Sequence, residues 1–200
     1  MLSPTWRISA FLLASAGEYS HSDKWEVLVE TNSKWPRFVS SNMRVIFADY
    51  DGVFHPVSDL HWFTMGLPVD TCIERGRLFR WTSILHQILD QHPDVRIVVH
   101  SGWRLLHPED RVKSLLGPLA ERVVHVISRD YDRGDGVAAY IAENEVEDYV
   151  ILDDRPDWFA PDTPRLVVCD SETGIYDGGV QAQLLEWLKS GDGAVRTRRS

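Results

Sequence analysis

The sequence contains few cysteines and no long hydrophobic run. Only two cysteines occur in 200 residues, Cys72 and Cys169, and they lie far apart and in no metal-ligand spacing. This pattern indicates reduced thiols in a cytoplasmic protein and leaves a single disulfide as the open alternative. No apolar run approaches the ~20 residues needed to cross a bilayer, so we expect no membrane contact.

The first 42 residues share no obvious pattern with the rest of the chain. Arg7 precedes a short apolar run over residues 8–16. Its last three residues, Ala14-Ser15-Ala16, resemble a signal-peptide cleavage site. Because the run is short and interrupted by Ser9, a helical or disordered extension over residues 1–42 is favoured over a signal peptide.

Positive charge is also scarce. The formal net charge is −9 and the sequence pI about 5.3, which disfavours a general nucleic-acid binder and leaves a local basic groove open. The sequence contains no Walker-type loop, nucleophile elbow or dinucleotide fingerprint, so those families of enzymes are not indicated.

From Met43 onward, apolar runs alternate with amphipathic segments. Strands are expected at the runs 43–49, 95–100, 123–127, 149–152 and 165–169, and helices at 80–91, near 108–119, at 137–144 and at 179–189. This alternation predicts a three-layer α/β/α, Rossmann-like domain with a mostly parallel sheet over residues 43–190. Residues 54–79 are expected to be irregular, and residues 191–200 to form a disordered basic tail.

Polar side chains follow three of these strands. Asp49 and Asp51 end the first, Ser101 follows the second, and Asp153 and Asp154 end the fourth. Each alone would suit a cap or a turn, but the carboxyl ends of parallel strands share one edge of the sheet, so the side chains should converge. Clustered carboxylates call for a hard cation, and the set suits Mg²⁺-assisted phosphoryl transfer.

The same residues carry a family resemblance. Asp49-Tyr50-Asp51-Gly52-Val53 resembles the first motif of the haloacid dehalogenase (HAD) superfamily of phosphohydrolases, the run 98–102 its second, and the run 150–154 its acidic fourth. The similarity covers residues 43–189. It implies a HAD fold and a phosphatase that acts through an aspartyl-phosphate.

The resemblance also implies a role for each site residue. Asp49 would be the nucleophile and Asp51 the general acid and base, while Ser101 and Gly102 would bind the phosphoryl group. Asp49, the backbone carbonyl of Asp51, Asp153 and Asp154 would hold Mg²⁺. The third motif normally supplies a lysine, which is missing here, so Arg133 takes that place with Arg129 as the fallback.

Two shorter matches bear on the substrate. The segment 52–56, taken with residues 101–104, resembles the small HAD domains of bacterial and phage RNA-repair assemblies. Asp153-Asp154-Arg155 resembles the phosphatase half of phage polynucleotide kinases, which removes 3′-phosphates. We therefore favour a nucleotide or a nucleic-acid end as the phosphorylated substrate over a sugar phosphate. No oligomeric state is predicted.

The interval 54–79 is too short for a large cap, so the domain is expected to be capless or minimally capped, with an open site. Trp62 and Phe63 within it suit base stacking or core packing, and core packing is favoured. Arg104 is assigned equally to a phosphate or to a carboxylate partner. His55, His100 and His125 form no metal-ligand spacing, and structural roles are expected for His100 and His125.

Two alternatives to this enzyme stay open. One is a non-catalytic HAD-like interaction module, which the intact acidic residues disfavour. The other is a HAD phosphatase of small metabolites. Dehalogenation is disfavoured, because it requires neither Asp51 nor a metal.

Overall fold

The structure, a computed structural model, describes residues 43–197, with side chains through Ser190. The expectations for residues 1–42, including the signal-peptide alternative, lie outside the described residues, as does the end of the tail at residues 198–200. Within the described part, no helix combines the length and the apolar character needed to cross a bilayer.

One parallel sheet of five strands forms the centre of the domain, in the order β3-β2-β1-β4-β5. Every residue of β1 is buried, as expected for a strand covered on both faces. The sheet comprises β1 (Arg44–Ala48), β2 (Val95–Val99), β3 (Val123–Val126), β4 (Asp148–Asp153) and β5 (Leu166–Val168).

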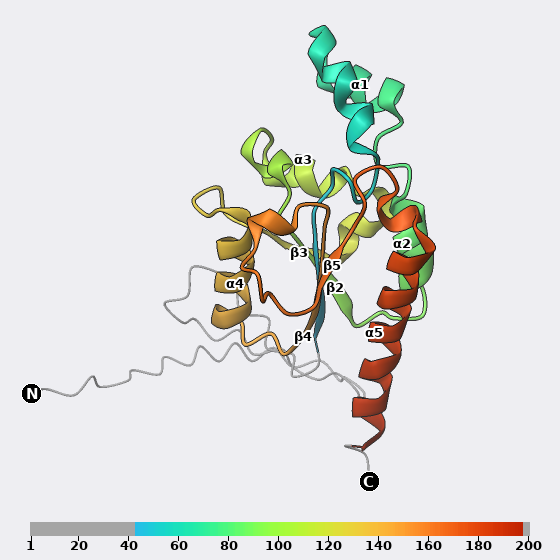
Figure 1. Cartoon of the computed structure of the whole chain (residues 1–200), viewed down its shortest axis with the longest axis vertical. Coiled ribbons are helices and arrows are strands. Elements are labelled where there is room, and N and C mark those ends of the chain that lie inside the picture. The colour runs from blue at the N-terminus through green and yellow to red at the C-terminus, as the bar shows by residue number, and fades with distance from the viewer. Residues whose placement is uncertain (1–42, 198–200) are drawn as a thin grey trace, which may run out of the picture.

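Helices cover both faces of this sheet (Figure 1). Ile46 and Ala48 of β1 belong to a core shared with α2 (Thr82–Leu89), α3 (Glu109–Ser114) and α5 (Gly178–Thr197). Val45 and Phe47, which alternate with them, face the opposite core beneath α4 (Arg133–Glu143). Because successive strand residues point to opposite faces, β1 contributes to both cores. The predicted three-layer α/β/α architecture is confirmed.

The interval 54–79 is helical where we expected it to be irregular. It contains a 3₁₀ helix, η1 (Val57–Met65), and the helix α1 (Val69–Gly76), which projects beyond the sheet in Figure 1. Two prolines and a glycine mark the ends of these helices. Pro56 is the N-cap of η1, Gly66 is the C-cap of η1, and Pro68 is the N-cap of α1. The insertion still forms only a small projection.

Aromatic residues of this insertion pack inward. Phe63 is half-buried against the core, with its ring centroid 5.8 Å from that of Trp103. Trp62 is also half-buried and lies under the guanidinium of Arg75, at 5.5 Å. Phe63 therefore packs against the core, as the sequence favoured, rather than presenting its ring for base stacking. Cys72 and Cys169 are both buried, and neither forms a disulfide within the described residues.

Two helix boundaries differ from our expectation. Helix α4 begins at Arg133 rather than at 137, because Gly134 and Gly136 serve close packing instead of a loop. A Cβ on Gly134 would stand 2.3 Å from the Trp158 carbonyl oxygen, and one on Gly136 2.3 Å from Ile127 Cγ2. Helix α5 continues to Thr197, so the backbone of residues 191–197 is helical where we expected a disordered tail.

The remaining connections are short. They include four 3₁₀ helices: η2 (Gly102–Leu105), η3 (Gly117–Arg122), η4 (Pro156–Trp158) and η5 (Gly174–Tyr176). Two of them, η2 and η4, follow β2 and β4 directly and lie at the carboxyl edge of the sheet.

Candidate active site

The strands deliver their polar residues to one edge because backbone pairing continues past the strand ends. The Asp49 amide donates to the Leu152 carbonyl at 3.0 Å, and the His100 amide donates to the Ala48 carbonyl at 3.1 Å. The Cys169 amide donates likewise to the Asp153 carbonyl at 2.9 Å. This pairing aligns the ends of neighbouring parallel strands, as predicted for a carboxyl-edge site.

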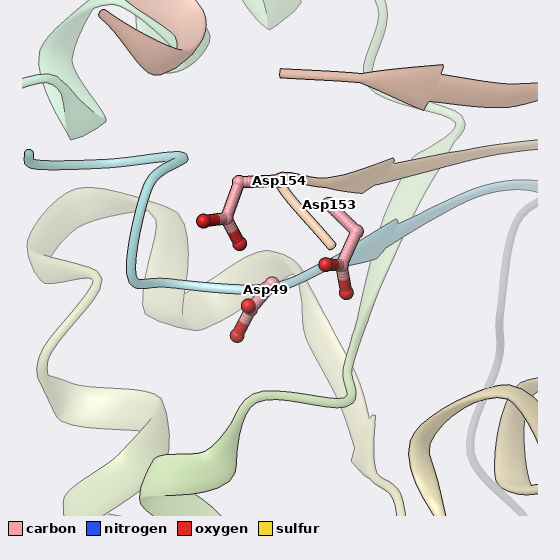
Figure 2. Close-up of side chains that lie close together, drawn as sticks. All are labelled: Asp49, Asp153 and Asp154. Carbon is pink, nitrogen blue, oxygen red and sulfur yellow. The ribbon is translucent and has the colours of Figure 1, made fainter. Parts of the chain in front are cut away.

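Asp49, Asp153 and Asp154 form a carboxylate cluster at this edge (Figure 2). One oxygen from each lies within 4.8 Å of the others, and Asp49 and Asp153 are fully buried. Asp49 Oδ1 is buried and has no hydrogen-bond partner among the described residues. Carboxylate oxygens at this spacing, one of them unpaired, fit the ligand preference of Mg²⁺.

Within the described part of the chain, Arg133 is the cation that pairs with this cluster. Its Nη1 donates to Asp49 Oδ2 and contacts both oxygens of Asp153, at 3.2 and 3.3 Å. Arg129 points elsewhere and donates to the His107 carbonyl at 2.7 Å. Of the two arginines considered for the third motif, only Arg133 faces Asp49. Gly102 lies against it, with a Cβ position 3.6 Å from Arg133 Nη2.

The cluster carries strongly perturbed acidities. Burial raises the pKa of Asp49 to about 8, and the nearby Asp153 charge adds to this while Arg133 opposes it. Burial likewise raises the pKa of Asp154 to about 6, with a contribution from Asp153. Burial would also raise the pKa of Asp153, but the hydrogen bond and charge of His100, together with Arg133, lower it. The cations among the described residues thus compensate the negative charge of Asp49 and Asp154 only in part.

Two histidines have positions that sequence reasoning missed. His100 Nε2 lies 2.9 Å from Asp153 Oδ2, and the Arg155 amide donates to Asp153 Oδ1 at 2.7 Å. His55 Nε2 lies 3.0 Å from Asp51 Oδ1. The signal for His55 was its position four residues after Asp51, across a glycine turn.

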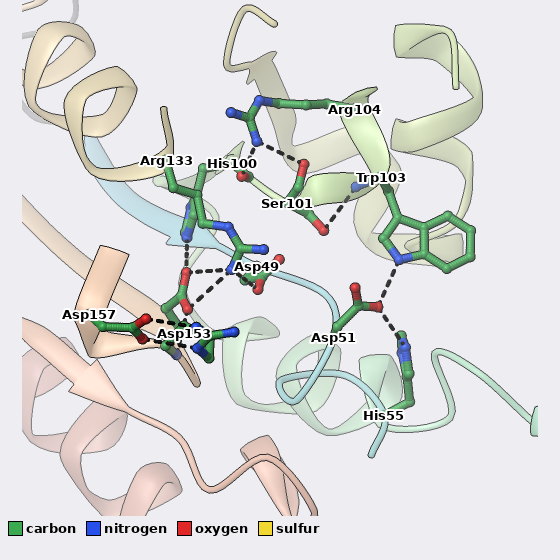
Figure 3. Close-up of polar contacts among 11 residues, drawn as sticks. Asp49, Asp51, His55, His100, Ser101, Trp103, Arg104, Arg133, Asp153 and Asp157 are labelled. Atoms are coloured by element: carbon green, nitrogen blue, oxygen red, sulfur yellow. Dashed lines mark hydrogen bonds and ion pairs between the residues drawn. The ribbon is translucent and has the colours of Figure 1, made fainter. Parts of the chain in front are cut away.

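Asp51 is held differently from Asp49. Its Oδ1 also accepts a hydrogen bond from Trp103 Nε1 at 2.8 Å, so Trp103 and His55 flank the same oxygen (Figure 3). Its side chain keeps a quarter of its surface exposed. Ser101 is buried, and its Oγ accepts a hydrogen bond from the Trp103 amide at 3.5 Å.

Arg104 binds backbone carbonyls rather than a carboxylate. It is buried, and its guanidinium donates to the backbone carbonyls of His100, Ser101, Ser128 and Tyr131 at 2.7–3.5 Å. Among the described residues Arg104 pairs with no carboxylate, so that role is wrong, whereas the role as a phosphate ligand stays a prediction. Arg104 ties the segment after β2 to the segment after β3.

A cavity of about 560 Å³ opens over the acidic residues. On one side of the site, Trp158 of η4 is 44% exposed, and the Arg133 guanidinium carbon lies 5.3 Å from its ring centroid. The lining residues are Asp49, Asp51, Val57, Leu60, Arg133, Asp154, Arg155, Cys169, Asp170 and Ser171.

One parallel sheet between two layers of helices, with carboxylates at the ends of β1 and β4, is the arrangement expected of a HAD-type domain. The family model for the HAD domain in Swiss Army Knife RNA repair proteins matches residues 45–180, and the chain belongs to this family. This assignment confirms the HAD resemblance and indicates a function of the HAD phosphatase type. Searches of curated proteins and of solved structures found no match.

Proposed function

We propose that this chain is a Mg²⁺-dependent phosphomonoesterase that acts through an aspartyl-phosphate on Asp49. The observation that carries the proposal is the contrast between two aspartates two residues apart. Asp49 is buried beside Arg133, whereas Asp51 is partly exposed and contacts His55 instead of an arginine. One carboxylate is thus placed to attack and the other to move protons.

In the first step, an Asp49 oxygen attacks phosphorus while the bond from phosphorus to the leaving oxygen breaks. Asp51 gives its proton to that oxygen, which departs as an alcohol. Arg133 and Ser101 stabilise the charge on the transferring phosphoryl oxygens, with the Gly102 backbone beside them.

In the second step, Asp51 takes a proton from water, and the resulting hydroxide attacks phosphorus. The bond from phosphorus to Asp49 breaks, which releases phosphate and regenerates both carboxyl groups. Asp49, the Asp51 backbone carbonyl, Asp153 and Asp154 would hold Mg²⁺, which supplies charge neutralisation at the phosphoryl oxygens. His100 and the Arg155 amide keep Asp153 oriented toward that position.

As the substrate we propose the phosphorylated end of a nucleic acid. The family is described from RNA repair proteins, and the small insertion between β1 and α2 leaves room for a macromolecular end. The exposed ring of Trp158 lies next to Arg133, where the base beside the reacting phosphate would stack. The net charge of −9 argues for local contacts or a partner rather than a broad basic surface.

The test is phosphate release from an aryl phosphate and from 3′- and 5′-phosphorylated oligonucleotides, with Mg²⁺ and with chelator. We expect metal-dependent release by the wild type and none by Asp49→Asn, while exposed Asp90→Asn serves as the control. Activity that persists with chelator, or in Asp49→Asn, would refute the mechanism. Silence on every substrate would favour the non-catalytic interaction module.

A further inference from the structure

The hydrogen bonds of His55 define its tautomer. The Phe79 amide donates to His55 Nδ1 at 3.4 Å, so Nδ1 accepts and the proton of a neutral ring resides on Nε2. Nε2 then donates to Asp51 Oδ1 at 3.0 Å. Phe79 has a left-handed backbone, with φ of 62°, which a non-glycine residue rarely adopts. The backbone strain at Phe79 accompanies the placement of its amide against His55.

Trp103 supplies the second donor from another strand end. Its Nε1 donates to Asp51 Oδ1 at 2.8 Å, and its ring is 6% exposed. The ring packs edge-on against Phe79 and Phe63, at centroid distances of 5.3 and 5.8 Å. His55 packs on the same Phe79 ring at 5.0 Å. Both donors are therefore held by a common aromatic cluster.

Both donors meet one oxygen of Asp51. Among the described residues, Oδ2 of the same carboxyl group has no hydrogen bond, and Asp51 lines the cavity over the acidic cluster. A carboxyl group whose Oδ1 accepts two hydrogen bonds carries its proton on Oδ2.

We propose that Trp103 and His55 are positioning residues, which fix Asp51 so that Oδ2 exchanges the proton with the leaving oxygen and with water. This inference rests on the proposed function. It assigns a role to two residues outside the acidic set, one from the segment 52–56 and one from the segment 101–104.

The chain offers a matched pair of substitutions at His55. In His55→Gln, the side-chain amide occupies the Nε2 position and keeps a donor for Asp51. In His55→Asn, the side-chain oxygen occupies the Nδ1 position, so the Phe79 contact survives and the donor to Asp51 is lost. The two variants remove opposite halves of the ring from a fully buried site.

The readout is the ratio of kcat/KM for an alkyl phosphate to kcat/KM for 4-nitrophenyl phosphate. These constants include departure of the leaving group and exclude the later hydrolysis, and nitrophenolate leaves without a proton. We expect His55→Asn and Trp103→Phe to lower the ratio ~10–100-fold, because general acid catalysis contributes ~10²–10⁴-fold. His55→Gln should keep it near the wild-type value.

The control for lost ring volume is Trp81→Phe, which replaces a buried indole of the same core with a smaller ring and leaves the contacts of Asp51 in place. Equal losses on both substrates in Trp103→Phe and His55→Asn would overturn the positioning role, since a structural defect does not distinguish leaving groups. So would a loss in His55→Gln as large as in His55→Asn.

A second measurement is independent of turnover. The indole ¹H–¹⁵N signals, assigned by Trp103→Phe and Trp81→Phe, are compared between wild type and Asp51→Asn. We expect the largest change at Trp103 Nε1–H. An unchanged Trp103 signal would refute the inference even in an inactive protein, whereas a shifted signal with no phosphatase activity would refute only the proposed function.

Discussion

Gly52 and Asp154 lie in direct contact beside the acidic cluster. A Cβ on Gly52 would stand 2.5 Å from the Asp154 carboxyl carbon, and Gly52 has a left-handed φ of 69°. The glycine that follows the first acidic pair therefore serves two purposes. It lets the chain turn after Asp51, and it lets Asp154 approach Asp49.

We predict that Gly52→Ala weakens Mg²⁺ dependence and lowers activity, because the new methyl group displaces the Asp154 carboxylate. The left-handed backbone adds about 1–2 kcal/mol of destabilisation. Gly66→Ala is the matched control: its φ is 67°, and nothing lies within 4 Å of its Cβ position. Urea unfolding should show a backbone cost in both variants, and a Mg²⁺ titration of phosphate release should change only in Gly52→Ala. Equal Mg²⁺ titrations would contradict the contact.

Arg133 is predicted to be required for phosphoryl transfer. Arg133→Ala removes the charge beside Asp49 and Asp153, and we expect kcat/KM to fall ~10²–10³-fold, as for loss of one preorganised donor. Arg133→Lys should recover part of the loss, because the charge remains at the start of α4. Arg129→Ala removes a guanidinium that donates to a carbonyl instead, and it should leave the steady-state kinetics unchanged. A comparable loss in both alanine variants would exclude the assignment.

Arg104 is predicted to act through stability. Arg104→Met leaves carbonyls of His100, Ser101, Ser128 and Tyr131 without their donor, and we expect a cost of about 3 kcal/mol. The comparison is Arg111→Met, which breaks an exposed ion pair with Asp70 that is worth at most about 1 kcal/mol. Urea denaturation measures both variants. Equal unfolding free energies for Arg104→Met and wild type would show that the hydrogen bonds from Arg104 to these carbonyls do not stabilise the domain.

The sheet was predictable because each strand is mainly apolar, and the acidic residues at its carboxyl edge followed from the same reasoning. The boundaries that failed depended on tertiary packing. Gly134 and Gly136 read as loop residues, yet they begin a helix because other parts of the chain approach their Cα atoms. Likewise, the prolines of the interval 54–79 mark helix ends, and only packing against the core distinguishes these from loops.

The nearest neighbours of the acidic residues were harder to predict. His100 was expected to be structural, but a residue two strands away, Asp153, receives its hydrogen bond. Trp103 and His55 meet Asp51 only because a tight turn and the start of η2 come together in space. No periodicity in the sequence reports such contacts between distant segments. Arg104 shows the converse, since a cation beside a motif turned out to bind backbone carbonyls.

Acid is predicted to destabilise the domain partly through His125. Burial lowers the pKa of this side chain to about 4, with Glu109 opposing and Lys113 adding to the effect. Between pH 6.5 and pH 4, His125 binds a proton in the unfolded chain but not in the folded chain. The buried neutral histidine is therefore fully tolerated above pH 6.5, and the folded state loses stability as the pH falls below that value. The slope approaches ~1.4 kcal/mol per pH unit.

His125→Asn removes this titration and leaves the other titrating groups of the domain in place. As the pH falls from 6.5 to 4, the wild type should therefore lose more unfolding free energy than His125→Asn does. Measuring both proteins under the same Mg²⁺ concentration cancels the contribution of the acidic cluster, whose raised pKa values act in the opposite direction. A difference that stays constant over this range would contradict the prediction.

The last prediction concerns Trp158 and the class of substrate. Its ring is 44% exposed and is stacked by Arg133, which itself contacts Asp49. Base stacking contributes ~1–3 kcal/mol, so Trp158→Ala should raise KM for a phosphorylated oligonucleotide ~5–100-fold, and Trp158→Phe should raise it less. A substrate without an aromatic ring, such as an alkyl phosphate, cannot use the stacking surface, and its KM should stay unchanged. A parallel rise for both substrates would instead mean that Trp158 only orients Arg133, and the phosphate rather than the base would then be what this side of the site recognises.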